Sequence, residues 1–384
     1  MYRKRLVFWA ACIGLLFFGI SIITLGSVAA ELREKLQLDE ISFGTLFSIL
    51  PFGVLIGSLF FGPIVDKYGY KILLVISCIL IFAGFEGIAF SPSIGLLKAY
   101  IFLFGIGGGA VNGATNALVA DISDKDKGAN LSLLGVFYGL GALGMPLISG
   151  ILLNIVSSQI ILASVGFLAL ITGLFFVIIR FPPPKQAQGF PIIQSKKLIR
   201  DKVLLLIGFF LFLQSGFEGI INNWTTTYLT EQHAVQQSNA LYALSSFVIG
   251  LTGMRLLIGS LFRSVPSGKI LIASFGLVIP GLILIATGIS FFITVVGLVL
   301  LGAGLAGGFP IMLAFAGNRY TELSGTAFSI VFFIAMVGNM IINYGMGIIA
   351  HSFGIDHLMT FAFMITGFML LLSMIILNRL RNNK

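Results

Sequence analysis

Long apolar stretches separated by short polar gaps run through the whole chain. Each stretch is close to the about 20 residues that an α-helix needs to cross a hydrocarbon core about 30 Å thick. Breaking the chain at its charged or Pro-, Gly- and Ser-rich gaps therefore predicts an all-α membrane protein with 12 transmembrane helices. The predicted helices span residues 6–30, 41–65, 71–91, 96–120, 129–154, 157–180, 202–229, 238–262, 269–289, 291–317, 322–350 and 354–378.

The amino-acid composition also indicates a protein that lies in a lipid bilayer. Hydrophobic residues make up 58% of the 384 residues and charged ones 10%, which leaves too little polar surface for a soluble globule. The first apolar run is long and lacks a small-residue cleavage site, so no signal peptide is expected. Cys12 and Cys78 lie inside predicted helices, which argues against a disulfide framework or a cysteine metal site. Neither a cofactor nor a metal is expected, and no set of nucleophile, histidine and acid suggests an enzyme.

The distribution of Lys and Arg predicts the orientation. With both termini in the cytoplasm, all but four of the 23 basic residues fall on the inner side; the four are Arg33, Lys35, Lys98 and Arg255. This predicts a multi-pass protein of the cell inner membrane. The formal charge of +9 then reflects topology and contact with anionic lipid. The expected partners are the bilayer and a small solute, nucleic acid is not expected, and the chain is expected to act as a monomer.

The chain also repeats itself. Residues recur at a constant spacing of 197: Gly62 and Gly259, Gly105 and Gly302, Gly128 and Gly325, Ser132 and Ser329, Gly141 and Gly338, Gly150 and Gly347. The repeat predicts two pseudo-symmetric six-helix bundles, residues 1–180 and 202–384. A basic linker, residues 181–201, joins them, and its Pro182-Pro183-Pro184 forbids a continuous helix.

The polar gap between the second and third predicted helices reads Gly-Pro-Ile-Val-Asp-Lys-Tyr-Gly-Tyr-Lys over residues 62–71. Gly62 allows two helices to touch, Asp66 can cap a helix or pair with a cation, and Gly69 permits a turn. The stretch resembles the major facilitator superfamily signature G-x-x-x-D-[RK]-x-G-[RK]-[RK] and departs from it at Tyr70. Its second copy, residues 259–269, is degraded, with Arg263 where Asp66 would be.

This resemblance implies the major facilitator fold: two parallel halves, a central site near the bilayer midplane, and rocking between inward- and outward-open states. It also implies that the loop takes part in gating. Gly62, Asp66 and Lys67 are the candidate gating residues, and Arg255 joins them because it lies about two turns inside the predicted cytoplasmic end of the eighth helix. For Arg255 a gate contact or ion pair is the preferred interpretation, and contact with an anionic substrate is the alternative.

Polar residues inside helices carry the functional information, because a charge near the bilayer centre costs about 2.5 to 3.5 kcal/mol on insertion scales. The seventh helix places one narrow polar face in the membrane, with an amide and an indole beside it. Amides and an aromatic plane suit a polyol, and Glu218 is the candidate proton-coupling residue; the alternative is a structural Glu bonded to a neighbouring helix. The face comprises Gln214, Glu218, Asn222 and Thr225, with Asn223 and Trp224 beside it.

Further candidate solute ligands lie on three other helices. Asn112 and Asn116 share a face of the fourth helix, behind a run of glycines. Asn339 and Asn343 share a face of the eleventh, and Tyr138 of the fifth can reach the same cavity; helix–helix hydrogen bonding explains these three equally well. Glu86 of the third helix has no assigned role.

Short motifs along most of the chain are similar to those of the fucose-galactose-glucose:proton symporter family. They are residues 112–116, Phe217-Glu218 followed by Trp224, Gly253-Met254-Arg255 and Gly308-Phe309-Pro310. The fucose symporters of that family carry coupling acids on the first and fourth helices. Here residues 6–30 contain no acid and the fourth-helix position is Asn112. The resemblance therefore implies sugar symport but leaves proton coupling to another residue, for which Glu218 is the candidate.

The antiporter signature of the superfamily, G-x-x-x-G-P-x-x-G-G, is only partly present in the fifth helix, where Met145-Pro146 replaces Gly-Pro. The prediction is a secondary active transporter, not an enzyme, that moves a small polar solute by alternating access with proton coupling. A sugar is the preferred solute. A proton-coupled exporter of drugs or metabolites is the alternative.

Overall fold

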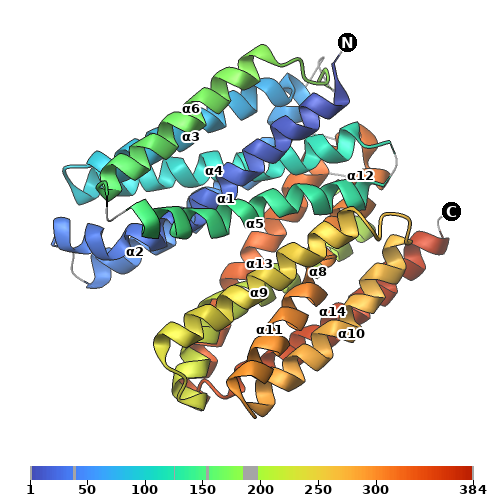
Figure 1. The fold of residues 1–384 in the computed structure, drawn as a ribbon. Helices are drawn as coiled ribbons and strands as arrows, with labels where there is room; N and C mark the ends of the chain where they lie inside the picture. The colour runs from blue at the N-terminus through green and yellow to red at the C-terminus, as the bar shows by residue number, and fades with distance from the viewer. Residues whose placement is uncertain (1, 38–39, 125, 153–154, 185–197, 383–384) are drawn as a thin grey trace. The chain divides into compact units, whose positions relative to one another are not determined.

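Each apolar stretch of the sequence is helical in the computed structural model, which describes residues 2–382 except 38–39, 125, 153–154 and 185–197. Among these residues, 12 helical segments are long and apolar enough to cross a membrane. The helices form two compact units (Figure 1). The first unit comprises Met1–Asp124, Phe137–Ser195 and Tyr320–Ser329, and the second comprises Lys125–Val136, Lys196–Arg319 and Ile330–Lys384.

The first unit contains most of the N-terminal helices. They are α1 (Lys4–Lys35), α2 (Glu40–Tyr68), α3 (Tyr70–Phe90), α4 (Ile94–Ile122), the later part of α5 (Lys127–Leu152), and α6 (Ser158–Ile178). Helix α4 packs against α1, α2 and α3, and α3 packs along α6 (Figure 1). Gly69, between α2 and α3, has a φ of 82°, so the turn of the loop signature needs a residue without a side chain.

The second unit contains most of the C-terminal helices. They are α8 (Lys202–His233), α9 (Gln237–Gly259), α10 (Ser267–Thr287), α11 (Phe291–Leu305), α12 (Gly308–Arg319), α13 (Ser324–Phe353) and α14 (His357–Asn382), with a short 3-10 helix η1 (Thr321–Leu323) before α13. The Asp201 side chain caps α8 by accepting from the backbone N–H groups of Val203 and Leu204, at 2.8 and 3.0 Å. The first turns of α13 belong to the first unit and the first turns of α5 to the second.

The helix predicted over residues 291–317 is broken in the structure, and the prediction of one continuous helix is wrong here. Helix α11 ends at Leu305, and α12 begins at Gly308 after a turn. Pro310 has no N–H, so the carbonyl four residues before it lacks its helical donor. That carbonyl belongs to Ala306, and the Leu305 carbonyl next to it, also at the break, accepts from the Gln214 side chain at 2.6 Å. The two helices still form one membrane-spanning segment, Phe291–Arg319.

Glycines bring helix backbones into contact in each unit, and they do so at repeated positions. Between α2 and α4, a Cβ on Gly53 or on Gly105 would lie 2.5 Å from a backbone oxygen of the partner helix. Between α9 and α11, a Cβ on Gly250 or Gly302 would lie 2.2 or 2.0 Å from one. These glycines are 197 residues apart in pairs, so the sequence repeat corresponds to a repeated helix contact.

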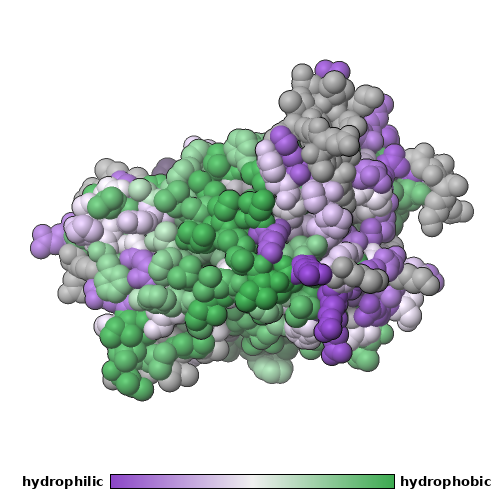
Figure 2. All heavy atoms as spheres, turned by 90° about the horizontal axis from the view of Figure 1, so that it is seen from above, coloured by the Kyte–Doolittle hydropathy of each residue, from purple (hydrophilic) through white to green (hydrophobic). Residues whose placement is uncertain are grey.

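The outward-facing side chains are largely apolar. Phe60, Ile171, Leu174 and Leu371 are each more than half exposed. On the face shown in Figure 2, hydrophobic residues gather in one broad area with hydrophilic residues beside it. An exposed apolar surface of this extent is unfavourable in water and favourable against lipid tails.

Candidate functional site

The middle of α8 carries a buried amide and a carboxyl that bond to each other. Gln214 is fully buried, and its Nε2 donates to Glu218 Oε1 at 3.0 Å and to the Leu305 carbonyl at 2.6 Å. Gly308 leaves room for this amide, because a Cβ there would lie 1.9 Å from Gln214 Oε1. Asn222 is exposed and donates to the Glu218 carbonyl at 2.7 Å. The predicted polar face thus exists, but its Gln214 is committed to holding Glu218 and the α11–α12 break.

Arg255 of α9 belongs to the same unit and acts on the same carboxyl. Its side chain is 8% exposed, and its charge interacts electrostatically with Glu218. The guanidinium lies against Gly135 of α5, where a Cβ would be 3.0 Å from Arg255 Cδ and 3.3 Å from Nη1. Arg255 Nε is buried without a hydrogen-bond partner among the described residues.

The two amides of α4 are brought together as predicted. Asn112 and Asn116 are 9% and 8% exposed, and Asn116 Nδ2 donates to the Asn112 carbonyl at 2.8 Å and to its Oδ1 at 3.2 Å. Asn112 Oδ1 thereby points along the helix toward Asn116. Tyr138 of α5 lies in the same unit, with its ring 5.6 Å from that of Phe18.

The remaining amides connect α8 to α13. Asn339 Nδ2 donates to the Ser215 carbonyl at 2.7 Å, and Asn223 Nδ2 donates to Asn343 Oδ1 at 2.9 Å. Gly219 of α8 makes the space for them, since a Cβ there would lie 2.3 Å from Asn343 Nδ2. The Trp224 ring lies beside Gly347, 3.6 Å from where a Cβ would be. Asn223, Asn339 and Asn343 therefore form helix–helix hydrogen bonds in this structure.

The loop signature acts at the start of α13. Asp66 is 1% exposed, and its Oδ2 accepts from Thr326 N at 2.8 Å and from Thr326 Oγ1 at 2.6 Å. Gly62 touches the same turn, because a Cβ there would lie 2.2 Å from the Gly325 carbonyl oxygen. Lys67 Nζ lies 5.0 Å from the centre of the Tyr68 ring. Asp66 therefore caps a helix that begins about 260 residues later in the chain.

Sequence reasoning missed a second carboxylate next to this cap. Asp121, at the end of α4, accepts from Ser324 Oγ at 2.6 Å and from the Tyr70 hydroxyl. Tyr70 is the position at which the loop departs from the signature, so a neutral hydroxyl stands where a cation is usual. An acid directly after the fourth predicted helix was the available signal.

The second copy of the loop makes a contact of the opposite charge. Arg263 Nε donates to Asp126 Oδ2 at 3.1 Å and its Nη2 to Asn130 Oδ1 at 2.8 Å, at the start of α5 in the second unit. Arg263 and Asp126 are 44% and 45% exposed, so this ion pair contributes at most about 1 kcal/mol. In the degraded copy, Arg263 thus contacts the start of α5, as Asp66 contacts the start of α13, but with a positive charge instead of a negative one.

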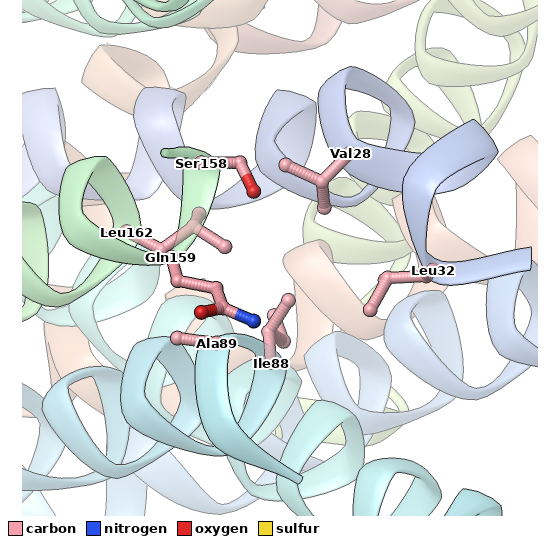
Figure 3. A pocket seen from close by; sticks show the side chains of 7 residues that line it. All are labelled: Val28, Leu32, Ile88, Ala89, Ser158, Gln159 and Leu162. Atoms are coloured by element: carbon pink, nitrogen blue, oxygen red, sulfur yellow. The ribbon is translucent and has the colours of Figure 1, made fainter. Parts of the chain in front are cut away.

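Two small cavities lie among the described residues. One, of about 10 Å³, lies between α1, α3 and α6 and is lined by Val28, Leu32, Ile88, Ala89, Ser158, Gln159 and Leu162 (Figure 3). A second, also about 10 Å³, adjoins Gln214 and Gly308. Each is the size of about one water molecule and neither holds a sugar. Glu86 contacts the α6 backbone at Gly166, where a Cβ would be 3.1 Å from its Oε1. No three His, Cys, Asp or Glu side chains of the described part are placed to hold a metal ion.

Several known membrane transporters have similar sequences. The inner membrane transport protein YdiN of Escherichia coli is 26% identical over 253 residues, 62% of this chain and 58% of that protein. A D-xylose transporter of Levilactobacillus brevis is 27% identical over 33% of this chain and 28% of its own. The 4-hydroxybenzoate transporter PcaK of Pseudomonas aeruginosa is 27% identical over 49% of this chain and 41% of its own.

Solved structures agree on the fold. The fucose:proton symporter FucP of Escherichia coli superposes with a TM-score of 0.80 at 16% identity, covering 97% of this chain and 99% of that one. The proton:xylose symporter XylE superposes with a TM-score of 0.76 at 14% identity, covering 94% of each chain. The sequence model of the Major Facilitator Superfamily matches residues 10–331. The chain therefore belongs to the Major Facilitator Superfamily and is a multi-pass secondary transporter with that family's fold, not an enzyme.

Proposed function

We propose that the chain is a proton-coupled symporter of a small hydroxylated solute, with a sugar as the first candidate. The observation that carries the proposal is the carboxyl of Glu218, held in the middle of a membrane-spanning helix by Gln214 and facing the charge of Arg255. An ionisable group at this depth is expensive and is retained where it moves a charge. Similarity to xylose and fucose symporters supports the choice of a sugar, and similarity to 4-hydroxybenzoate transporters supports a hydroxylated solute more broadly.

The candidate solute ligands fall into two sets, one in each unit. In the first unit they are Asn112, Asn116 and Tyr138, whose amides and phenol suit hydroxyl groups. In the second they are Gln214, Asn222, Asn223, Trp224, Asn339 and Asn343. Of these, Asn222 is exposed and donates to the Glu218 carbonyl. Asn339 and Asn343 also bond to α8, so in this proposal they hold the helix pair as well as contacting solute.

Gating is assigned to the contacts at the starts of α13 and α5. Asp66 and Gly62 hold the first turn of α13, and α13 continues into the second unit. A contact on that turn is therefore sensitive to any movement of one unit against the other. Lys67 and Arg255 complete the proposed gate. The charge pattern supports cytoplasmic termini in a cell inner membrane, and the chain acts as a monomer in this proposal.

The test is uptake by the purified chain in liposomes across a panel of neutral sugars, with and without an inward proton gradient. Gradient-stimulated uptake that a protonophore abolishes supports the symporter. Drug-driven proton movement without sugar uptake would reverse the assignment in favour of the exporter.

A further inference from the structure

Arg255 is a buried cation that forms no hydrogen bond within the part of the chain that the structure describes. Its side chain is 8% exposed, and its Nε is buried without a hydrogen-bond partner among the described residues. A guanidinium taken out of water is stable only when an anion and hydrogen-bond acceptors replace the water. The missing side chain of Gly135 gives it space, because a Cβ there would lie 3.0 Å from Arg255 Cδ.

Glu218 is an acid whose carboxyl interacts electrostatically with Arg255. The groups that act on its carboxyl in the described part of the chain are Arg255 of α9 and Gln214 of its own helix. Gln214 Nε2 is shared with the Leu305 carbonyl, so α11 contributes a neutral acceptor rather than a charge. Arg255 therefore has an anion in electrostatic range but not in contact. Its five N–H donors, arranged in a planar fork, remain available for a bidentate carboxylate.

We propose that Arg255 binds a carboxylate of the transported solute, so that the solute is a small hydroxylated carboxylic acid carried as an anion. The inference rests on the proposed symport function and narrows its substrate class from small hydroxylated solutes to hydroxylated carboxylic acids. It gives Arg255 a contact with the solute rather than a gate contact. The Glu218 carboxylate and the solute carboxylate are both attracted by the positive charge of the Arg255 guanidinium. Glu218 takes up a proton from the water on the side to which the site is open, and this removes its negative charge. Arg255 can then pair with the solute carboxylate.

This competition fixes the charge balance of the transport cycle. One proton bound on Glu218 and one monoanion bound on Arg255 add no net charge to the loaded carrier. On the opposite side the anion leaves Arg255 and the proton leaves Glu218 to water, which restores the starting pair. Uptake of the acid is then driven by a pH gradient and not by membrane potential alone. Symport of a neutral sugar with a proton would instead carry one positive charge and respond to potential.

The test uses the full chain with three matched pairs: galacturonate and galactose, gluconate and sorbitol, 4-hydroxybenzoate and 4-hydroxybenzyl alcohol. Binding is measured by the ligand-induced rise in unfolding temperature, and uptake is measured in liposomes. At least one acid is expected to stabilise the wild type while its neutral partner does not. Arg255→Gln is expected to weaken that acid by about 30-fold or more, because a buried charge pair loses one member. Arg255→Lys, which keeps the charge but not the fork, is expected to fall between.

Arg379→Gln is the matched control, because Arg379 is an exposed arginine near the end of α14 and should bind the acid as the wild type does. Uptake of the acid is expected to follow an imposed pH gradient and not a potassium diffusion potential. The proposal is overturned if every acid and its neutral partner act alike, if Arg255→Gln and Arg255→Lys bind the acid as the wild type does, or if potential alone drives its uptake. If any of these outcomes is found together with uptake of a neutral sugar under a proton gradient, the symport proposal is supported and only the proposal of a carboxylate substrate is contradicted.

Discussion

The two amides of α4 differ in whether their hydrogen-bond donors are already used within the protein. Asn116 uses its Nδ2 on the Asn112 carbonyl and Oδ1, so its donor is largely spent within the helix. No described protein group takes the donor of the Asn112 amide, although the side chain is 9% exposed. We therefore expect Asn112 to contact the solute and Asn116 to orient the Asn112 side chain.

Asn112→Ala should raise the KM for uptake, because leaving a solute hydroxyl unpaired costs about 1 to 3 kcal/mol of binding free energy. Asn116→Ala should have a smaller effect of the same sign, since it releases the Asn112 oxygen without removing a solute contact. Uptake kinetics and thermal unfolding of each variant separate binding from folding. If both variants lose stability in proportion to their loss of binding, the amides serve helix packing and this assignment is wrong.

At the scale of elements, the crossing of α2 and α4 depends on residues without side chains. A Cβ on Gly109 would lie 2.2 Å from the Val54 carbonyl oxygen, and backbone cannot move aside as a side chain can. Gly109→Ala should therefore lower the stability of the protein by about 1 to 3 kcal/mol, as other overpacked substitutions do.

Gly95, near the start of the same helix, provides the control, because no atom lies within 4 Å of its missing Cβ. Gly95→Ala should unfold at the wild-type temperature in detergent, and Gly109→Ala should unfold below it. Equal unfolding temperatures for the two variants would mean that the helices do not pack as closely as described.

Most of the helices could be predicted because the bilayer sets their length and polar gaps mark their ends. The segment predicted over residues 71–91 is α3, Tyr70–Phe90, and the one predicted over 269–289 is α10, Ser267–Thr287. The break before Gly308 was missed because apolar composition continues across it. Gly307, Gly308 and Pro310 together were the local signal, and Gln214 supplies the bond that a continuous helix would have made.

The site was less predictable, because its contacts depend on packing between distant segments. Helical spacing predicted correctly that Asn112 and Asn116 share a face. It could not indicate that Asp66 caps a helix 260 residues later, or that Arg263 and Asp126 pair across 137 residues. These partners are fixed by tertiary structure rather than by local periodicity.

At the scale of the whole molecule, the cap on α13 is a candidate control point of the transport cycle. Asp66→Asn keeps an oxygen to accept from Thr326 but removes the negative charge from the start of the helix. A charge at that position is worth about 0.3 to 2 kcal/mol, enough to shift the balance between two conformations. We expect slower turnover with normal membrane insertion, measured as initial uptake rate per folded protein.

Arg263→Gln is the comparison for this variant, because its ion pair with Asp126 is half exposed and should matter less. Normal turnover in Asp66→Asn would remove the gating role from the loop and leave Asp66 as a structural cap.

The central claim is that ionisation of Glu218 couples proton movement to solute movement, and Glu218→Gln tests it most directly. Gln imitates the protonated carboxyl and can keep a hydrogen bond to Gln214, which lies 3.0 Å away in the wild type. The measurement compares accumulation driven by a pH gradient with exchange between two solute-filled compartments, in liposomes that contain the wild type or the variant. The account predicts that Glu218→Gln still exchanges solute but no longer accumulates it against a gradient. Proton-driven accumulation at the wild-type level in Glu218→Gln would contradict the account and place coupling on another residue.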